Sequence, residues 1–203
     1  MKTTMPWNKG VAVGQKAPLK HYQVWRIRRL LETEGKLRDL ALFSLALDSM
    51  LRSSDILRLK VGDICGTHLK PKARLRIQQK KTGKPVEVEL SEYARTALAS
   101  WIIRSGKTET DYLFTRRGEP HGERLSSVRH RQLVKKWVQA IGLNPEDYST
   151  HSLRRTLPSF VYHETKNIEA VRNLLGQNSV TATSRYLNVG GKDSLNVARP
   201  FRL

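Results

Sequence analysis

The segment from Thr150 to Val189 combines an imidazole, guanidinium groups and a phenol on a background that is otherwise typical of helices. His151 and Arg154 are three residues apart, so on a helix beginning near Ser149 both side chains would share one face. Two hydrogen-bond donors at this spacing can hold one phosphate group from one side. Tyr186 follows in the polar segment TATSRYLN, which predicts a short helix or a turn.

A single arginine follows the most apolar stretch of the chain. Residues Leu37–Met50 are hydrophobic on nearly every side of a helix, which predicts a helix inside the core. Arg52 comes directly after it, at the start of a short predicted helix, Arg52–Leu59, that Ser53 or Ser54 could cap. Taken alone, an arginine in this place is more often a solvated charge than a functional group.

A predicted hairpin follows this helix. Leu75–Gln79 and Val86–Leu90 alternate apolar and polar residues, and the sequence KKTGKP between them is typical of a turn. Val61–Ile64 is a candidate third strand of the same small antiparallel sheet. The turn contains three lysines, Lys80, Lys81 and Lys84.

In this order, the residues resemble the tyrosine recombinase (phage integrase) family. Its signature is an arginine, a hairpin lysine, a His-x-x-Arg pair, a variable histidine or tryptophan, and a tyrosine. The resemblance runs from about Pro18 to Val189, and an ordered set of dispersed residues is more specific than one motif. The matching residues are Arg52, Lys81, His151, Arg154, Gln177 and Tyr186.

Two details of the resemblance concern neighbouring residues. The family commonly places its lysine just before Thr-Gly, which favours Lys81 and leaves Lys80 as the alternative. Where the family has Arg-x-x-Glu, this chain has Arg52 and Asp55, so Asp55 is expected to orient the first arginine or a neighbour.

The resemblance implies cleavage of DNA without a metal or another cofactor. Arg52 and Arg154 would hold the non-bridging oxygens and carry the negative charge of the transition state. His151 would add a hydrogen bond and assist proton movement. Lys81 would protonate the departing 5′-oxygen, and Tyr186 would attack in line and form a covalent 3′-phosphotyrosine.

The sequence departs from the family at one position. Where Leu-Gly-His is usual, the chain reads Leu175, Gly176, Gln177. A glutamine can donate a hydrogen bond to a phosphoryl oxygen, but it cannot carry charge or shuttle a proton. Gln177 is therefore expected to affect the rate more than the type of reaction.

The composition predicts a nucleic-acid partner. The formal net charge of +19 favours a polyanion, and no apolar run reaches membrane-spanning length, so DNA is favoured over lipid. The single cysteine excludes an internal disulfide and indicates a reducing cytoplasm or the nucleoid. Besides the turn lysines Lys80 and Lys84, the residues expected to contact DNA are Arg124, Arg129, Arg131, Lys135, Lys136 and Arg155.

The predicted fold class is α+β and mostly helical, a tyrosine-recombinase catalytic domain with a small antiparallel β-sheet. Residues 1–19 are expected to form a flexible basic arm, residues 20–189 the catalytic domain, and residues 190–203 a tail that subunits exchange. In the helix Lys20–Glu34, Tyr22 and Trp25 are expected on the buried face. Ser91 is expected to cap a helix ending near Ser105. A further helix is expected from Ser126 or Ser127 to Ile141, with Val128 facing inward.

The chain resembles the short, single-domain members of the family, such as the fimbrial phase-switch invertases. The resemblance implies a site-specific recombinase that acts as a tetramer on double-stranded DNA with short inverted repeats, with a possible accessory DNA-bending protein and no membrane. A recombinase-derived DNA-binding protein without turnover and a type IB topoisomerase are the alternatives. Covalent capture by a nicked substrate would exclude the first, and exchange between duplexes would exclude the second.

Overall fold

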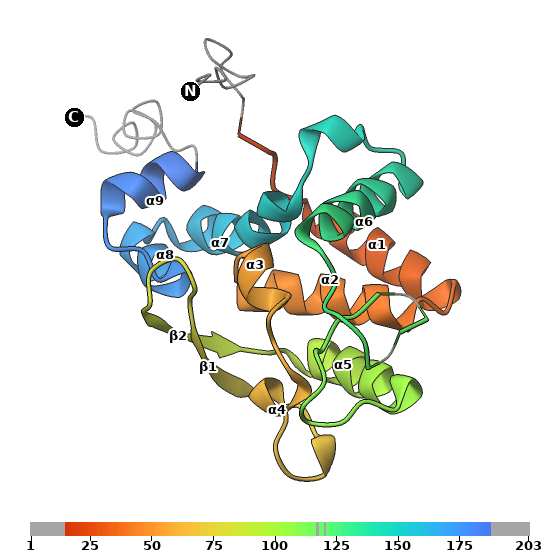
Figure 1. Ribbon diagram of the computed structural model, residues 1–203. Helices are drawn as coiled ribbons and strands as arrows, with labels where there is room; N and C mark the ends of the chain where they lie inside the picture. Colours follow the sequence, from red (N-terminus) through yellow and green to blue (C-terminus); the bar gives the residue numbers. More distant parts are fainter. Residues whose placement is uncertain (1–14, 117, 120, 188–203) are drawn as a thin grey trace, which may run out of the picture.

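The apolar helix α2 (Leu37–Ser49) lies at the centre of the core, as predicted. In the computed structural model, which describes residues 15–116, 118–119 and 121–187, α2 packs against α1 (His21–Thr33), α5 (Glu92–Ser105) and α7 (Thr150–Thr165) (Figure 1). Every residue from Asp39 to Leu47 is buried. Burial on all sides explains why this helix has no polar face.

Helix α1 buries Ile27 and Leu31 but not the two aromatic residues that were expected on the same face. Its buried residues are Gln23, Ile27 and Leu31, which recur every four residues. Tyr22 and Trp25 are 54% and 63% exposed, so the prediction that they face inward is wrong. The polar Gln23 takes the inner face because its Oε1 accepts a hydrogen bond from Lys20 N at 2.8 Å and completes the start of the helix.

The hairpin has the predicted form. Strands β1 (Arg74–Gln78) and β2 (Pro85–Glu89) are antiparallel, and their alternate residues are buried, with Leu75 opposite Val88. The predicted third strand is wrong, because Val61–Ile64 forms the short helix α4. Asp63 Oδ2 accepts a hydrogen bond from Lys60 N at 2.8 Å and so stabilises the start of that helix.

Two predicted serine caps are confirmed. Ser91 Oγ accepts a hydrogen bond from Ala94 N at the start of α5. Ser126 Oγ accepts one from Arg129 N at the start of α6 (Ser127–Ala140). Val128 does not face inward but is 59% exposed, because it lies in the first turn of α6 and the buried stripe begins at His130.

The remaining elements are short. Helix α3 (Ser53–Ile56) is shorter than predicted and makes no side-chain cap bond. Helix α8 (Ile168–Leu175) packs against α7, α9 (Val180–Leu187) and β2, which places the hairpin beside α8 (Figure 1). The other short elements are the 3-10 turns η1 (Thr67–Leu69) and η2 (Pro145–Asp147).

Part of the predicted flexible arm packs on the domain. Ala17 N donates to Asp147 O at 3.0 Å, and Leu19 is buried with its N–H donating to Thr156 Oγ1 at 3.1 Å. The prediction of a flexible arm is therefore wrong for residues 15–19, while residues 1–14 and the predicted tail 190–203 lie outside the described residues. Within the described part of the chain, no helix is both long and apolar enough to cross a membrane.

Candidate active site

Arg52 lies at the N-cap position of α3, where its side chain meets the end of β1. Its Nη1 donates to Gln79 Oε1 at 2.5 Å and lies 4.0 Å from Asp55 Oδ2. Asp55 is 1% exposed, and its Oδ1 accepts a hydrogen bond from Lys80 N at 2.9 Å. Asp55 therefore connects the first arginine to the lysine-bearing turn.

The His-x-x-Arg pair begins helix α7. Ser149 caps this helix through its Oγ, which accepts a hydrogen bond from His151 N at 3.2 Å. Arg154 is 3% exposed, and its Nη2 donates to Leu175 O at 3.1 Å. Its Nη1 is buried and meets no acceptor among the described residues other than the Tyr186 hydroxyl. A buried guanidinium nitrogen that meets no carboxylate or carbonyl is suited to an anionic ligand.

Positive charge surrounds His151. Although His151 reaches solvent, its pKa is lowered, first by desolvation and then by the nearby charges of Arg154 and Arg52. The ring is therefore neutral at neutral pH, and one of its nitrogens can accept a proton.

Tyr186 in α9 lies close to the same arginines. Burial raises the pKa of Tyr186, and the charges of Arg154, Arg155 and Arg52 oppose that rise. Its Oη is buried and lies against the Arg154 guanidinium, which lowers the pKa of the phenol both as a charge and as a hydrogen-bond donor. Tyr186 packs against a small cluster that includes Met50 and Val171. The structure thus brings together the predicted residues Arg52, His151, Arg154 and Tyr186.

Gln177 follows the C-terminus of α8. Gly176 ends this helix in the left-handed conformation, with φ of +60°, as the sequence predicts. Gln177 N donates to Arg172 O, and the Gln177 carbonyl accepts from Arg172 Nη1 at 2.8 Å. Its side-chain Oε1 accepts a hydrogen bond from Thr183 Oγ1 at 2.7 Å. This contact directs the amide toward α9, the helix that carries Tyr186.

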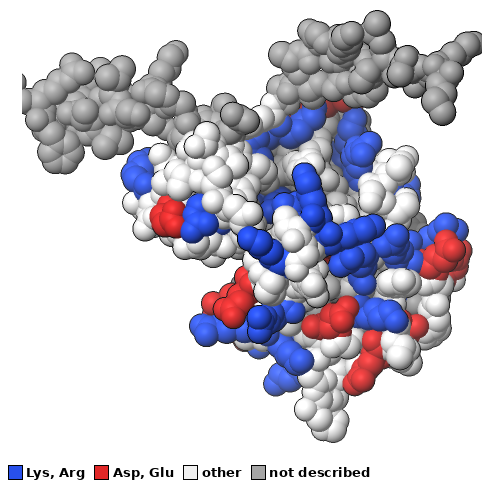
Figure 2. Space-filling model, turned by 60° about the vertical axis from the view of Figure 1, so that its left-hand side comes forward, with Lys and Arg blue, Asp and Glu red and all other residues white. Residues whose placement is uncertain are grey.

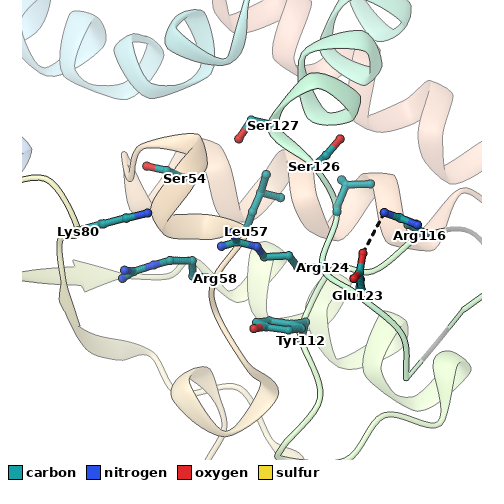
Figure 3. A pocket seen from close by; sticks show the side chains of 11 residues that line it. Ser54, Leu57, Arg58, Lys80, Tyr112, Arg116, Glu123, Arg124, Ser126 and Ser127 are labelled. Atoms are coloured by element: carbon teal, nitrogen blue, oxygen red, sulfur yellow. Dashed lines mark hydrogen bonds and ion pairs between the residues drawn. The ribbon is translucent and has the colours of Figure 1, made fainter.

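The lysines occupy different parts of the hairpin turn. Lys81 is exposed there, and Lys84 Nζ donates to Asn178 Oδ1 at 3.1 Å. Lys80 extends into a pocket of about 540 Å³ between α3, the hairpin and the start of α6. Arg124 enters the pocket from the opposite side (Figure 3). The residues that line the pocket are Ser54, Leu57, Arg58, Lys80, Tyr112, Arg116, Glu123, Arg124, Leu125, Ser126 and Ser127.

Sequence reasoning missed Arg58 and Arg116 as pocket residues. Arg58 Nη2 lies 3.4 Å from Gln78 O, and Arg116 forms an ion pair with Glu123 at 2.9 Å. The available signal was position: Arg58 lies six residues after Arg52, just beyond the end of α3. To recognise Arg58 and Arg116 as pocket residues, one would also have to know where residues 112–127 lie. This segment forms isolated β-bridges and no regular strand, so the sequence pattern does not predict its position.

The structure contradicts one predicted DNA contact. Arg155 is 5% exposed, its Nη1 donates to Lys16 O at 2.6 Å, and its guanidinium lies 5.5 Å from the centre of the Tyr186 ring. It stabilises the packing of the N-terminal segment instead of reaching the surface. Lys135 is partly exposed and pairs with Glu146 at 2.6 Å. The exposed members of the predicted set are Lys80, Lys84, Arg124, Arg129, Arg131 and Lys136.

Comparisons with known proteins agree with this arrangement. The model of the phage integrase family matches residues 18–192. The chain is 28% identical over 169 residues to the probable integrase/recombinase YoeC of Bacillus subtilis, covering 82% of this chain and 86% of YoeC. It is 30% identical over 190 residues to the tyrosine recombinase XerC of Haemophilus ducreyi, covering 88% of this chain and 60% of XerC.

The fold is also similar to solved recombinases. A crystal structure of XerA recombinase has a TM-score of 0.72 at 19% identity, over 94% of this chain and 66% of that one. XerH site-specific recombinase bound to difH substrate has a TM-score of 0.71 at 18% identity, over 95% of this chain and 56% of that one. This chain spans little more than half of several relatives, including a Pseudothermotoga lettingae tyrosine recombinase (54%). The match over residues 18–192 shows that the chain belongs to the phage integrase family of tyrosine recombinases.

Proposed function

We propose that this chain cleaves and rejoins DNA at specific sites through a 3′-phosphotyrosine formed by Tyr186. The observation that carries the proposal is that the buried Tyr186 hydroxyl and the buried Arg154 guanidinium lie against each other beside Arg52, while Arg154 Nη1 and Tyr186 Oη bond to no other described residue. A phosphodiester in this place would be bound by the guanidinium groups and would lie within reach of the hydroxyl. The similar XerH was solved with its difH substrate, and lambda integrase with a core site.

The protonation states support a division of roles. The raised pKa of Tyr186 keeps its hydroxyl protonated at neutral pH, so the attack on phosphorus requires a proton acceptor. The lowered pKa of His151 leaves a neutral imidazole, which can assist that transfer. As the bond from Tyr186 Oη to phosphorus forms, the bond to the 5′-oxygen breaks, and Lys81 donates a proton to that oxygen.

The arginines bind the reacting phosphate. Arg52 and Arg154 present planar guanidinium groups that match two phosphate oxygens and stabilise the added negative charge in the transition state. Gln177 adds a neutral donor through its amide. Rejoining reverses these steps with a 5′-hydroxyl as the nucleophile, so the bond energy is conserved in the phosphotyrosine.

A basic surface would hold the DNA on either side of this phosphate. Lys and Arg gather in a band across the middle of one face, with Asp and Glu toward its edges (Figure 2). Arg58, Lys80 and Arg124 around the pocket next to α3 are suited to backbone phosphates (Figure 3). We propose double-stranded DNA with short inverted repeats as the partner.

The proposed assembly follows the same reasoning. A tetramer would bring two DNA sites together, with residues 20–189 as the catalytic domain of each subunit and residues 190–203 exchanged between subunits. An accessory DNA-bending protein and association with the nucleoid in the cytoplasm complete the proposal. Crosslinking on and off inverted-repeat DNA tests the tetramer.

Replacement of the nucleophile tests the function. With nicked duplexes that carry inverted repeats found next to the gene, if any occur there, the wild-type protein should form a denaturant-resistant protein–DNA adduct. Tyr186→Phe should bind the same DNA and form none, because only the attacking hydroxyl is removed. Tyr162→Phe is the matched control, since Tyr162 packs against the same small cluster as Tyr186 and should keep the adduct.

The outcomes separate the alternatives. Formation of an adduct by Tyr186→Phe would show that a residue other than Tyr186 is the nucleophile. One alternative is a recombinase-derived DNA-binding protein, which is favoured by Gln177 in place of histidine. In that case the wild-type protein would bind the duplexes but form no adduct. Adduct formation without strand exchange between two duplexes would instead favour a type IB topoisomerase.

A further inference from the structure

A buried glutamine lies between the parts of the candidate active site. In β1, alternate residues face the core, and Gln79 continues the face of Leu75 and Ile77 one step beyond the strand. Gln79 is only 3% exposed although it is polar. A buried amide is retained where its hydrogen bonds are made, so its partners show what it does.

Both lone pairs of the Gln79 carbonyl face other parts of the site. Oε1 accepts from Arg52 Nη1 at 2.5 Å and from Thr82 Oγ1, in the lysine-bearing turn, at 3.3 Å. The Gln79 backbone also closes this turn, because Gly83 N donates to Gln79 O and Gln79 N donates to Lys84 O, each at 2.9 Å. One residue therefore contacts the first arginine and fixes the turn.

The other end of the amide meets the helix that anchors the second arginine. Gln79 Nε2 lies where a side chain on Gly176 would be, 2.9 Å from the position of a Cβ. Gly176 follows Leu175, whose carbonyl accepts from Arg154 Nη2. The Gln79 side chain thus fills the space between Arg52 and the C-terminus of α8, which holds Arg154.

We infer that Gln79 is a positioning residue: it fixes the Arg52 guanidinium relative to Arg154 and the lysine-bearing turn, so that both arginines meet one phosphate. This inference rests on the proposed function. A misplacement of about 1 Å can slow an enzyme by roughly 10²-fold. The effect of losing Gln79 should appear in the chemical step and should depend on Arg52.

The first test compares two neighbouring glutamines. Gln79→Met keeps the side-chain length but removes the acceptor for Arg52. Gln78→Met is the matched control, because Gln78, the last residue of β1, is exposed and its Nε2 donates to Gly83 O at 3.1 Å, not to Arg52. Single-turnover cleavage of saturating nicked DNA should fall roughly 10²-fold for Gln79→Met and stay within about twofold for Gln78→Met. The DNA Kd of both should stay near the wild-type value.

A second test distinguishes positioning from loss of folding. In an Arg52→Lys background, Gln79→Met should change the cleavage rate by less than about twofold, because the Arg52 guanidinium that Gln79 positions is absent. In ¹⁵N NMR spectra of the free protein, rotation of the Arg52 guanidinium should be restricted in the wild type and in Gln78→Met. It should be released in Gln79→Met.

Each result decides the inference. Wild-type cleavage by Gln79→Met, an equal loss of rate in both backgrounds, or unchanged restriction of the Arg52 guanidinium in Gln79→Met would overturn it. The NMR comparison requires no cleavage, so it decides the contact even where Arg52→Lys is inert. Absence of an adduct with the wild-type protein would refute the proposed function instead, and the NMR result would still report on Gln79.

Discussion

Individual residues in this site are set by burial as much as by charge. Burial raises the pKa of the Tyr186 phenol and lowers the pKa of the His151 imidazole. The free protein therefore holds a protonated phenol and a neutral imidazole, both close to the Arg154 and Arg52 charges. Gln177 differs most from the family pattern, which has a histidine at this position. The amide of Gln177 stays neutral at every pH, whereas a histidine can carry charge.

Substitutions at Gln177 should affect the chemical step alone. Gln177→Ala removes one donor to the phosphoryl oxygen and should raise the barrier to cleavage by roughly 1–3 kcal/mol. Gln177→His should keep or increase the rate. DNA affinity should change little in both variants, as measured by single-turnover cleavage and by binding titration of the same nicked duplex.

The Thr183 contact allows a sharper version of this comparison. Thr183→Val should slow cleavage in the same direction as Gln177→Ala, because Thr183 Oγ1 holds the Gln177 amide. Ser184→Ala is the control, since Ser184 Oγ bonds to Val180 O in the same helix and does not contact Gln177. Equal, robust rates for all four variants would show that Gln177 takes no part in the chemistry.

At the scale of elements, local signals predicted helix ends better than helix faces. Ser91, Ser126 and Gly176 act through one or two nearby backbone groups, so the sequence around them was sufficient. The exposure of Tyr22 and Val128 depends on which parts of the chain pack against α1 and α6, and a local sequence pattern does not predict this packing. Val61–Ile64 is too short for its apolar period to distinguish a strand from a helix. The hydrogen bond of Asp63 at the start of α4 favours the helix.

Helices α3 and α6 meet at a buried histidine, which makes stability dependent on pH. His130 Nδ1 lies 2.8 Å from Ser53 Oγ, next to Arg52, and burial lowers the pKa of His130 to about 4, with Asp39 opposing the shift. The unfolded chain, with a pKa near ~6.5, takes up the proton first. The stabilising effect is thus present above about pH 6.5 and is lost as the pH falls toward 4.

Urea unfolding at pH 7 and pH 5 measures this effect. The free energy of unfolding of the wild type should fall by about 2 kcal/mol more than that of His130→Asn over this interval. Asparagine retains a partner for Ser53 and does not titrate. His163→Asn, at an exposed position of α7, should follow the wild type. Parallel curves for wild type and His130→Asn would mean that His130 is not the group that titrates.

For the molecule as a whole, the sequence predicted which residues meet in the candidate active site better than it predicted the candidate DNA surface. Arg52, His151, Arg154 and Tyr186 occur in a fixed order, so the family pattern was enough to find them. A surface patch has no such order. Arg58 belongs to the patch because the fold places it in the pocket next to α3. Arg155 does not belong to it, because residues 15–19 pack over α7 and Lys16 O accepts a hydrogen bond from the Arg155 guanidinium.

The salt dependence of DNA binding tests which charges belong to that surface. For a chain of net charge +19, the logarithm of the association constant should fall steeply with the logarithm of salt concentration. Arg58→Ala and Arg124→Ala should each weaken binding and reduce the slope by about one, because each loses one phosphate contact. Arg74→Ala is the control. Arg74 lies at the opposite end of β1 from the turn and pairs with Glu89 at 3.7 Å, so its slope should match the wild type. Slopes that stay unchanged for Arg58→Ala and Arg124→Ala would place the DNA backbone outside this pocket, whatever the loss in affinity.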